Sequence, residues 1–267
     1  MKKKPISDGP QPQWVIPDAK EFQTFLHTKF PSMLEDVPVE TTLTLLRNQK
    51  IVSNFLRERT PYRGLLLYHG LGSGKSAASI TIAEGYKNRD IVVLLPASLH
   101  SNFSQEMRNF ETTNSYTILH YNSPLVVQNI VKQLLPKETY ADILHKNKNR
   151  SKSSPIRIYP RRITRDERLS EKEMTNFLDD LYDPKNEIMN PLSEKTIIID
   201  EVHNLTSMIL GGGVRGALLY ELIIRAKNIR LVCLSGTPAI NSVYELAILF
   251  NLLRGCLLYT SPSPRDP

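Results

Sequence analysis

The sequence has few cysteines and no long apolar run, and both features narrow its class. Two cysteines occur in 267 residues, Cys233 and Cys256, and they form no disulfide or metal-binding pattern. We therefore expect a reduced, intracellular and cytoplasmic protein. No apolar run reaches the roughly 18 residues of a membrane span, and the basic N-terminus lacks the apolar core of a secretory signal. We expect no membrane partner.

One segment carries the excess positive charge. The net charge is +7. The segment from Lys146 to Arg168 contains nine Lys or Arg residues and only two acidic residues, Asp166 and Glu167. Flanking Ser, Asn and Pro residues indicate that this segment is an insertion, at about 145–190. Two interpretations stay open: contact with the phosphate backbone of a nucleic acid, or a solvated loop.

A glycine-rich turn organises the rest of the chain. It follows the apolar run Leu65–Tyr68 and precedes a helical pattern. Its residues are Gly70, Leu71, Gly72, Ser73, Gly74, Lys75 and Ser76. Strand, glycine loop and helix start predict a phosphate-binding loop for a nucleotide such as ATP, with Lys75 on the β- and γ-phosphates and the Ser76 hydroxyl on Mg²⁺. A strict P-loop has glycine where this chain has His69, so a turn without a ligand is the alternative.

Alternating strands and helices predict an α/β fold with a doubly wound parallel sheet. The expected strands are 65–68, 91–95, 116–120, 196–199 and 230–234. The expected helices are 41–57, 77–84, 99–110, 124–135, 170–182, 214–226 and 242–254, two of them opened by the capping pairs Ser170 with Glu173 and Ser242 with Glu245. Residues 1–40 are interpreted as an extension with a short helix near 21–30.

Polar motifs follow two more of the expected strands, at the sheet edge where ligands bind. Asp200 and Glu201 come directly after four apolar or β-branched residues, which favours Mg²⁺ binding by Asp200 and water activation by Glu201 over a surface helix cap. His203 is either a structural histidine or a γ-phosphate sensor linked to the next motif. That motif, Ser235-Gly236-Thr237-Pro238, is either a plain turn or a coupling element.

Together these motifs resemble a known family. GLGSGKS, DEVH and SGTP, in this order, resemble motifs I, II and III of superfamily 2 helicases and DNA translocases. The segment 93–99 with Asn102 resembles motif Ia of the Swi/Snf-type branch, in which Pro96, Ala97, Ser98 and Asn102 would meet the nucleic-acid backbone. Gln49 stands where that family places an adenine-reading glutamine. The looser family motif I does not require glycine at position 69.

The resemblance covers roughly residues 41–254 and is strongest to helicase-like ATPases of large DNA viruses, akin to the small subunit of the poxvirus early transcription factor. It implies an ATP- and Mg²⁺-dependent motor on DNA or RNA, working with viral transcription machinery in a viral factory or virion. The implied catalytic residues are Glu201, Lys75 and His203, and the implied coupling residues are Ser235, Gly236 and Thr237. A non-motor P-loop NTPase, such as a nucleotide kinase, and an idle binding module are the alternatives.

The resemblance also bears on the domain organisation. Residues 41–255 would be the first of two RecA-like domains, and the second would supply an arginine finger. This chain alone should then bind ATP and hydrolyse it very slowly. Residues 256–267 resemble a translated sequencing adapter, so we expect them to be a scar outside the natural sequence.

Overall fold

A computed structural model describes residues 24, 47–56, 62–70, 74–86, 89–137 and 190–255. In chain order its elements are α2 (Arg47–Leu56), β1 (Gly64–Tyr68), α3 (Lys75–Glu84), β2 (Ile91–Leu95), η2 (Ala97–Leu99), α4 (His100–Asn109), β3 (Tyr116–His120), α5 (Val126–Leu134), β4 (Thr196–Ile199), α8 (Val202–Leu210), α9 (Val214–Arg225), β5 (Arg230–Ser235) and α10 (Tyr244–Arg254). Four expectations lie outside the described residues: the extension 1–40 apart from the helical Thr24, the basic segment, the helix at 170–182 and the proposed scar.

The five strands form one parallel sheet in the order β1-β5-β4-β2-β3. β5 therefore lies between β1 and β4, and the register pairs Tyr68 with Ser235 and Leu94 with Ile199. Because parallel strands end at the same edge, the motifs that follow β1, β4 and β5 come together there. The predicted doubly wound α/β fold is confirmed.

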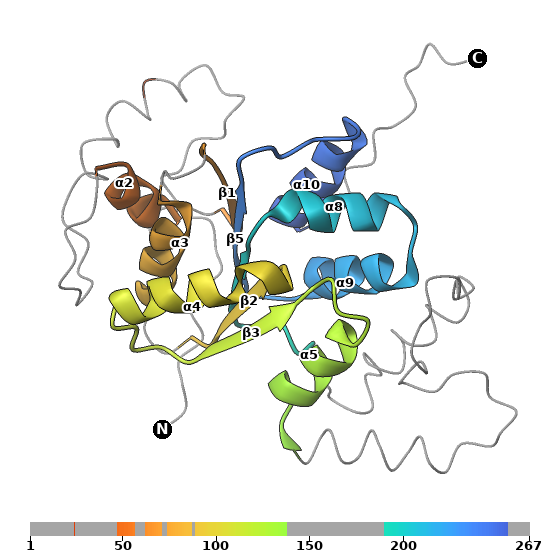
Figure 1. Ribbon diagram of the computed structural model, residues 1–267, viewed down its shortest axis with the longest axis horizontal. Coiled ribbons are helices and arrows are strands. Elements are labelled where there is room, and N and C mark those ends of the chain that lie inside the picture. Colours follow the sequence, from red (N-terminus) through yellow and green to blue (C-terminus); the bar gives the residue numbers. More distant parts are fainter. Residues whose placement is uncertain are drawn as a thin grey trace, which may run out of the picture.

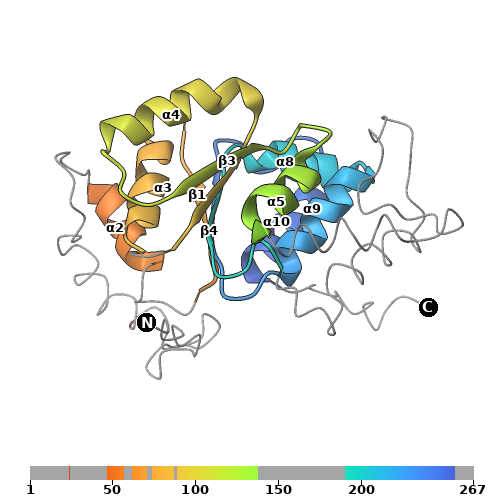
Figure 2. The same cartoon turned by 90° about the horizontal axis from the view of Figure 1, so that it is seen from below.

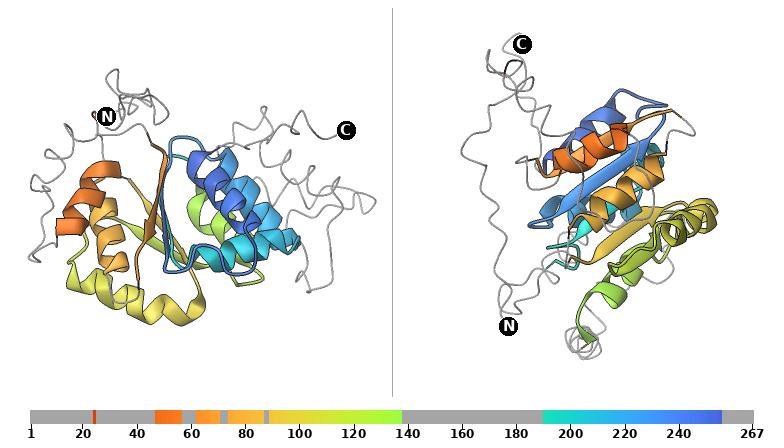
Figure 3. Two further views of the ribbon diagram at one scale, coloured as in Figure 1. Left: turned by 90° about the horizontal axis from the view of Figure 1, so that it is seen from above. Right: turned by 90° about the vertical axis from the view of Figure 1, so that its left-hand side faces the viewer.

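Helices cover both faces of this sheet (Figures 1 and 2). Helices α2, α3 and α4 lie on one face, and α5, α8, α9 and α10 lie on the other; Figure 3 shows the same three layers from two further sides. Side chains alternate along each strand, so that Val92 and Leu94 join one apolar cluster while Val93 and Leu95 join the other. Burial on both faces explains why the strands are continuous apolar runs.

The predicted strands agree closely with the structure, and one helix of the structure was not predicted. β2, β3 and β4 have the expected bounds, and β1 and β5 differ by one residue at one end. Helix α8 follows the acidic pair directly, at a place where no helix is predicted. Val202 and Leu205, both fully buried, lie on its apolar side. The three-residue spacing of these two apolar side chains is the feature of the sequence that could have indicated the helix.

The expected capping pair at the start of α10 forms differently. The Ser242 hydroxyl accepts a hydrogen bond from the backbone N–H of Tyr244. The Glu245 carboxylate does not reach back to Ser242; it accepts bonds from the N–H groups of Ile240 and Asn241 and from the Ser207 hydroxyl of α8. The reciprocal capping prediction is therefore wrong, because the half-buried Ser207 on α8 and two backbone N–H groups bind this carboxylate instead.

Among the described residues, no single helix is long and apolar enough to cross a membrane. Only the pair Val202–Leu210 and Arg215–Arg225, bent by 115°, meets that test of length and composition. Both helices supply side chains to the core, including Leu205 and Leu219.

Candidate nucleotide-binding site

The loop between β1 and α3 has the backbone of a phosphate-binding turn at its described end. Gly74 has φ 73° and ψ 34°, a left-handed conformation that favours glycine, and helix α3 begins at the next residue. The first backbone N–H groups of α3 therefore have no partner within the helix and face the turn. A helix start of this kind binds anions. Residues 71–73 lie outside the described residues, so the predicted roles of Leu71, Gly72 and Ser73 stay predictions.

Lys75 lies across this turn. Its Nζ donates to the backbone carbonyl oxygens of His69 and Gly70, both at 2.9 Å. The same ammonium lies near Gly236, where an added Cβ would be 3.9 Å from it. The lysine of the first motif thus lies between the ends of β1 and β5, where its partners among the described residues are two neutral carbonyl groups. A phosphate oxygen would form a stronger, charge-assisted bond with it.

Gln49 reaches the same turn from α2. Its side chain is buried, and its Nε2 lies 3.5 Å from the carbonyl oxygen of Gly74. The structure therefore brings the predicted adenine-reading residue to the phosphate loop. Its role toward adenine stays a prediction.

The acidic pair follows β4 in a constrained backbone. The Asp200 N–H donates to Leu94 of β2, which continues the sheet pairing by one residue. Glu201 then adopts a left-handed conformation, with φ 48° and ψ 53°, which is uncommon for a residue with a side chain. Its N–H donates to Oδ1 of Asp200 at 2.9 Å. This turn fixes the two carboxylates before α8 begins.

The environment of Asp200 suits a divalent cation. The residue is 7% exposed, and burial raises the pKa of its carboxyl group to about 6 even though the Glu201 N–H and Lys75 favour ionisation. A nearby cation would offset this desolvation. Ser76, in the first turn of α3, is the other predicted ligand. The described part of the chain holds no group of three or more His, Cys, Asp or Glu side chains that could bind a metal ion.

His203 links the second and third motifs. Its Nδ1 lies 3.0 Å from the Ser235 hydroxyl and 3.2 Å from a carboxylate oxygen of Glu201. The Ser235 hydroxyl also accepts a bond from the N–H of Thr237 at 3.0 Å. The predicted link from His203 to Ser235 is present, Thr237 is reached only through the Ser235 hydroxyl, and the contact with Glu201 was not predicted. The coupling role of Ser235, Gly236 and Thr237 itself stays a prediction.

The proposed motif Ia residues lie on the surface at the end of β2. Ala97 and Ser98 are exposed in η2, Asn102 is exposed in α4, and Pro96 is half-buried between β2 and η2. Exposed backbone and small polar side chains could accept a ligand here. Sequence reasoning missed Tyr121, which follows β3 and contacts the acidic pair, because a tyrosine after a strand carries no distinctive signal.

The parallel sheet brings a glycine loop, an acidic pair and a histidine–serine link together at one carboxyl edge, and such an edge suits the phosphates of a nucleotide and a divalent cation. The chain is 33% identical over 242 residues to R563 of Acanthamoeba polyphaga mimivirus, which is named as an ATP-dependent RNA helicase. That match covers 90% of this chain and 35% of R563. The termination factor NPH-I homolog of African swine fever virus is 28% identical over 204 residues, covering 73% of this chain and 23% of that protein.

The chain is also similar to a third viral protein. Frog virus 3 helicase 009L is 27% identical over 213 residues, covering 77% of this chain and 20% of that protein. No protein-family model matches the chain. Among solved structures, the SWI2/SNF2 ATPase core of Sulfolobus solfataricus in complex with dsDNA has a TM-score of 0.46 at 14% identity, covering 83% of this chain and 38% of that one. The chain is a homologue of helicase-like proteins of large DNA viruses, and it spans about a third or less of their length.

Proposed function

We propose that this chain is the first motor domain of an ATP-dependent helicase or translocase that acts on nucleic acid. One observation carries the proposal: Lys75, Asp200 and the His203–Ser235 pair follow three neighbouring strands of one sheet edge. A plain glycine turn or a surface helix cap would need no such convergence. The sequence similarity to viral helicase-like proteins supports the same function.

Each residue has a distinct part in this function. Lys75 leaves the carbonyl oxygens of His69 and Gly70 and binds the β- and γ-phosphates of ATP. Ser76 and Asp200 would hold Mg²⁺, which would supply positive charge against the phosphates. Glu201 orients the attacking water and accepts its proton.

His203 and Ser235 connect the nucleotide site to the segment after β5, so a change at the phosphates can alter that segment. His203 touches both the carboxylate of Glu201 and the hydroxyl of Ser235, so a shift of Glu201 toward water would alter both contacts. Ser235 in turn holds the N–H of Thr237, in the segment that joins β5 to α10. Movement of that segment is the proposed output of the site.

The track would be DNA or RNA, bound in part by Pro96, Ala97, Ser98 and Asn102. Three of these residues are exposed, at the same sheet edge as the nucleotide site. Two relatives bear the names of an RNA helicase and of a termination factor homolog. We extend the proposal to viral transcription inside the infected cell or the virion.

Hydrolysis by this chain alone should be very slow. The family resemblance implies that a second RecA-like domain supplies an arginine to the transition state, and such an arginine accelerates hydrolysis by about 10³–10⁵-fold. The chain should therefore bind ATP well and turn it over slowly. Rapid hydrolysis by the chain alone, stimulated by DNA, would contradict this division of labour.

Titration of the 267-residue chain with a fluorescent ATP analogue and Mg²⁺ tests the proposal. Saturable binding that unlabelled ATP displaces supports it, and absence of displaceable binding overturns it. A second assay separates a motor from a nucleotide kinase. Transfer of the γ-phosphate to a nucleoside monophosphate would refute the motor, whereas slow release of inorganic phosphate without any such transfer supports it.

A further inference from the structure

Tyr121 is fully in the core, yet its hydroxyl contacts the backbone of the acidic pair. The residue is 2% exposed and directly follows β3. Its hydroxyl oxygen lies 3.2 Å from the carbonyl oxygen of Asp200 and 3.1 Å from that of Glu201. The backbone N–H of Asn204, in the first turn of α8, donates to the same Glu201 carbonyl at 3.0 Å. The phenol of Tyr121 thus connects the end of β3 to the acidic pair, directly before α8.

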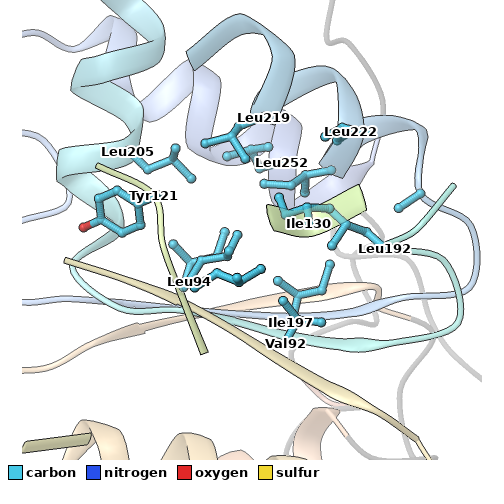
Figure 4. Close-up of a cluster of buried hydrophobic side chains, with 14 of the residues drawn as sticks. Val92, Leu94, Tyr121, Ile130, Leu192, Ile197, Leu205, Leu219, Leu222 and Leu252 are labelled. Atoms are coloured by element: carbon cyan, nitrogen blue, oxygen red, sulfur yellow. The ribbon is translucent and has the colours of Figure 1, made fainter. Parts of the chain in front are cut away.

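The contact crosses the sheet. β3 and β4 are not neighbours, because β2 lies between them, so no backbone pairing connects Tyr121 to the acidic pair. The ring spans that distance within the apolar cluster that includes Leu94 and Leu205, and Figure 4 shows its hydroxyl pointing away from these leucines. A long side chain with a terminal donor is needed for this reach.

The backbone at this point needs support. Glu201 has a positive φ, a conformation that is strained for a residue with a Cβ and persists only where its surroundings enforce it. The N–H of Asp200 is held by β2, and the N–H of Glu201 by its neighbour's carboxylate. In the described part of the chain, the Tyr121 hydroxyl reaches both carbonyl groups from across the sheet, and the Glu201 carbonyl also accepts the N–H of Asn204.

We propose that Tyr121 is a positioning residue for the proposed ATPase site: its hydroxyl fixes the peptide between Asp200 and Glu201, and thereby aims the Asp200 carboxylate at the Mg²⁺ position beside Ser76. This inference rests on the proposed function. Without the hydroxyl, the peptide is free to rotate toward an ordinary helical conformation, and the carboxylate turns with it. The direct nucleotide contacts of Lys75 remain.

A purely structural role for Tyr121 predicts something else. In that case, losing the hydroxyl lowers stability and leaves Mg²⁺ binding unchanged. Tyr116 provides the matched control, since its hydroxyl bonds to Glu84 at 2.8 Å on α3, away from the acidic pair. Tyr121→Phe and Tyr116→Phe remove the same atom and keep the same ring.

The experiment measures how strongly Mg²⁺ tightens nucleotide binding. A fluorescent ATP analogue is titrated into the 267-residue chain and both variants, with Mg²⁺ and with EDTA. For Tyr121→Phe we expect affinity in EDTA within about twofold of wild type, and a Mg²⁺-dependent gain smaller by about tenfold, equivalent to roughly 1.4 kcal/mol. Tyr116→Phe should keep the full gain.

An unchanged gain in Tyr121→Phe would overturn the proposal, as would an equal loss in Tyr116→Phe. If circular dichroism shows that Tyr121→Phe does not fold, 4-fluorophenylalanine at position 121 fills the space without donating and must show the same reduced gain. Failure of the wild-type chain to bind the analogue under either condition would overturn the proposed function and this inference together. If the wild-type chain binds the analogue normally and Tyr121→Phe keeps the full Mg²⁺-dependent gain, only this inference is overturned.

Discussion

Nδ1 of His203 lies 3.0 Å from the hydroxyl of Ser235, and this contact joins the helix after the acidic pair to the end of the neighbouring strand. It links the segment 200–203, which would hold Mg²⁺, directly to the segment 235–238, which would respond to the bound nucleotide. The Ser235 hydroxyl has contacts on two sides, because it also accepts a hydrogen bond from the N–H of Thr237. A change in His203 therefore reaches the segment after β5 through a single oxygen.

Removing that oxygen should uncouple the segment from the nucleotide. In Ser235→Ala we expect ATP affinity within about threefold of wild type, because no phosphate contact is assigned to this hydroxyl. Hydrogen exchange of residues 236–241 should slow when MgATP is added to wild type and stay fast in the variant. Stability should fall by about 1 kcal/mol for the lost hydrogen bonds.

Ser123→Ala is the control for this change. The Ser123 hydroxyl also accepts an N–H two residues further on, that of Leu125, and lies after β3. Its loss should leave the response of residues 236–241 intact. An undiminished MgATP response in Ser235→Ala would show that the motif is only a turn.

Lys75→Ala should remove most of the affinity for ATP. Two charge-assisted contacts of about 1.5–3 kcal/mol each would be lost, so the dissociation constant should rise roughly 100-fold or more. Lys195→Ala is the control, since Lys195 pairs with Asp90 at 3.0 Å at the opposite edge of the sheet. Affinity unchanged in a nucleotide titration of Lys75→Ala would refute the phosphate-loop assignment.

Gly74→Ala should damage both stability and binding. Its φ of +73° strains any side chain, and an added Cβ would lie 2.7 Å from Nε2 of Gln49. Gly212→Ala meets similar strain with open space around it, so it should lose only the conformational term of about 1 kcal/mol. Urea unfolding should therefore show a larger loss of unfolding free energy in Gly74→Ala than in Gly212→Ala, and the difference measures the contact with Gln49.

The double variant Gln49→Ala/Gly74→Ala checks that explanation. Shortening Gln49 clears the space that the new Cβ needs, so stability should recover toward that of Gln49→Ala. Strictly additive losses would mean that the two side chains do not meet.

The strands and the order of the motifs could be predicted from sequence because their physical causes are local. A buried parallel strand needs an unbroken apolar run, and Ile91–Leu95 and Thr196–Ile199 can be little else. The glycine loop is equally local, because its chemistry requires particular residues in a row. Even the contact between His203 and Ser235 could be expected, because their motifs come at the carboxyl ends of two parallel strands.

What could not be predicted depends on the order of strands and on contacts across them. Nothing near Tyr121 in sequence indicates that its hydroxyl passes over β2 to the acidic pair. Likewise, Glu245 fits a local capping pattern, and only the packing of α8 against α10 shows that its partner is Ser207. Gln49 was placed by resemblance alone, and its contact with Gly74 depends on how α2 packs on α3.

Glu245 should make stability depend on pH in acid. Its burial opposes ionisation, but bonds from Ser207, Ile240 and Asn241 outweigh that effect and lower the pKa from 4.5 to about 2. A carboxyl group with a lowered pKa in the fold stabilises it fully above the unfolded pKa. That contribution should therefore be present above about pH 4.5 and disappear as the pH falls toward 2.

Urea unfolding of wild type and Glu245→Gln across this range tests the assignment. The variant keeps the shape and loses the charge, so the difference in unfolding free energy should be largest near neutral pH and shrink below pH 4.5. Glu221→Gln is the control, since Glu221 pairs with Arg225 on the partly exposed side of α9, where an ion pair contributes about 0–1 kcal/mol. A difference for Glu245→Gln that stays constant from neutral pH into acid would mean that its carboxylate does not hold α8 to the β5–α10 connection through its charge.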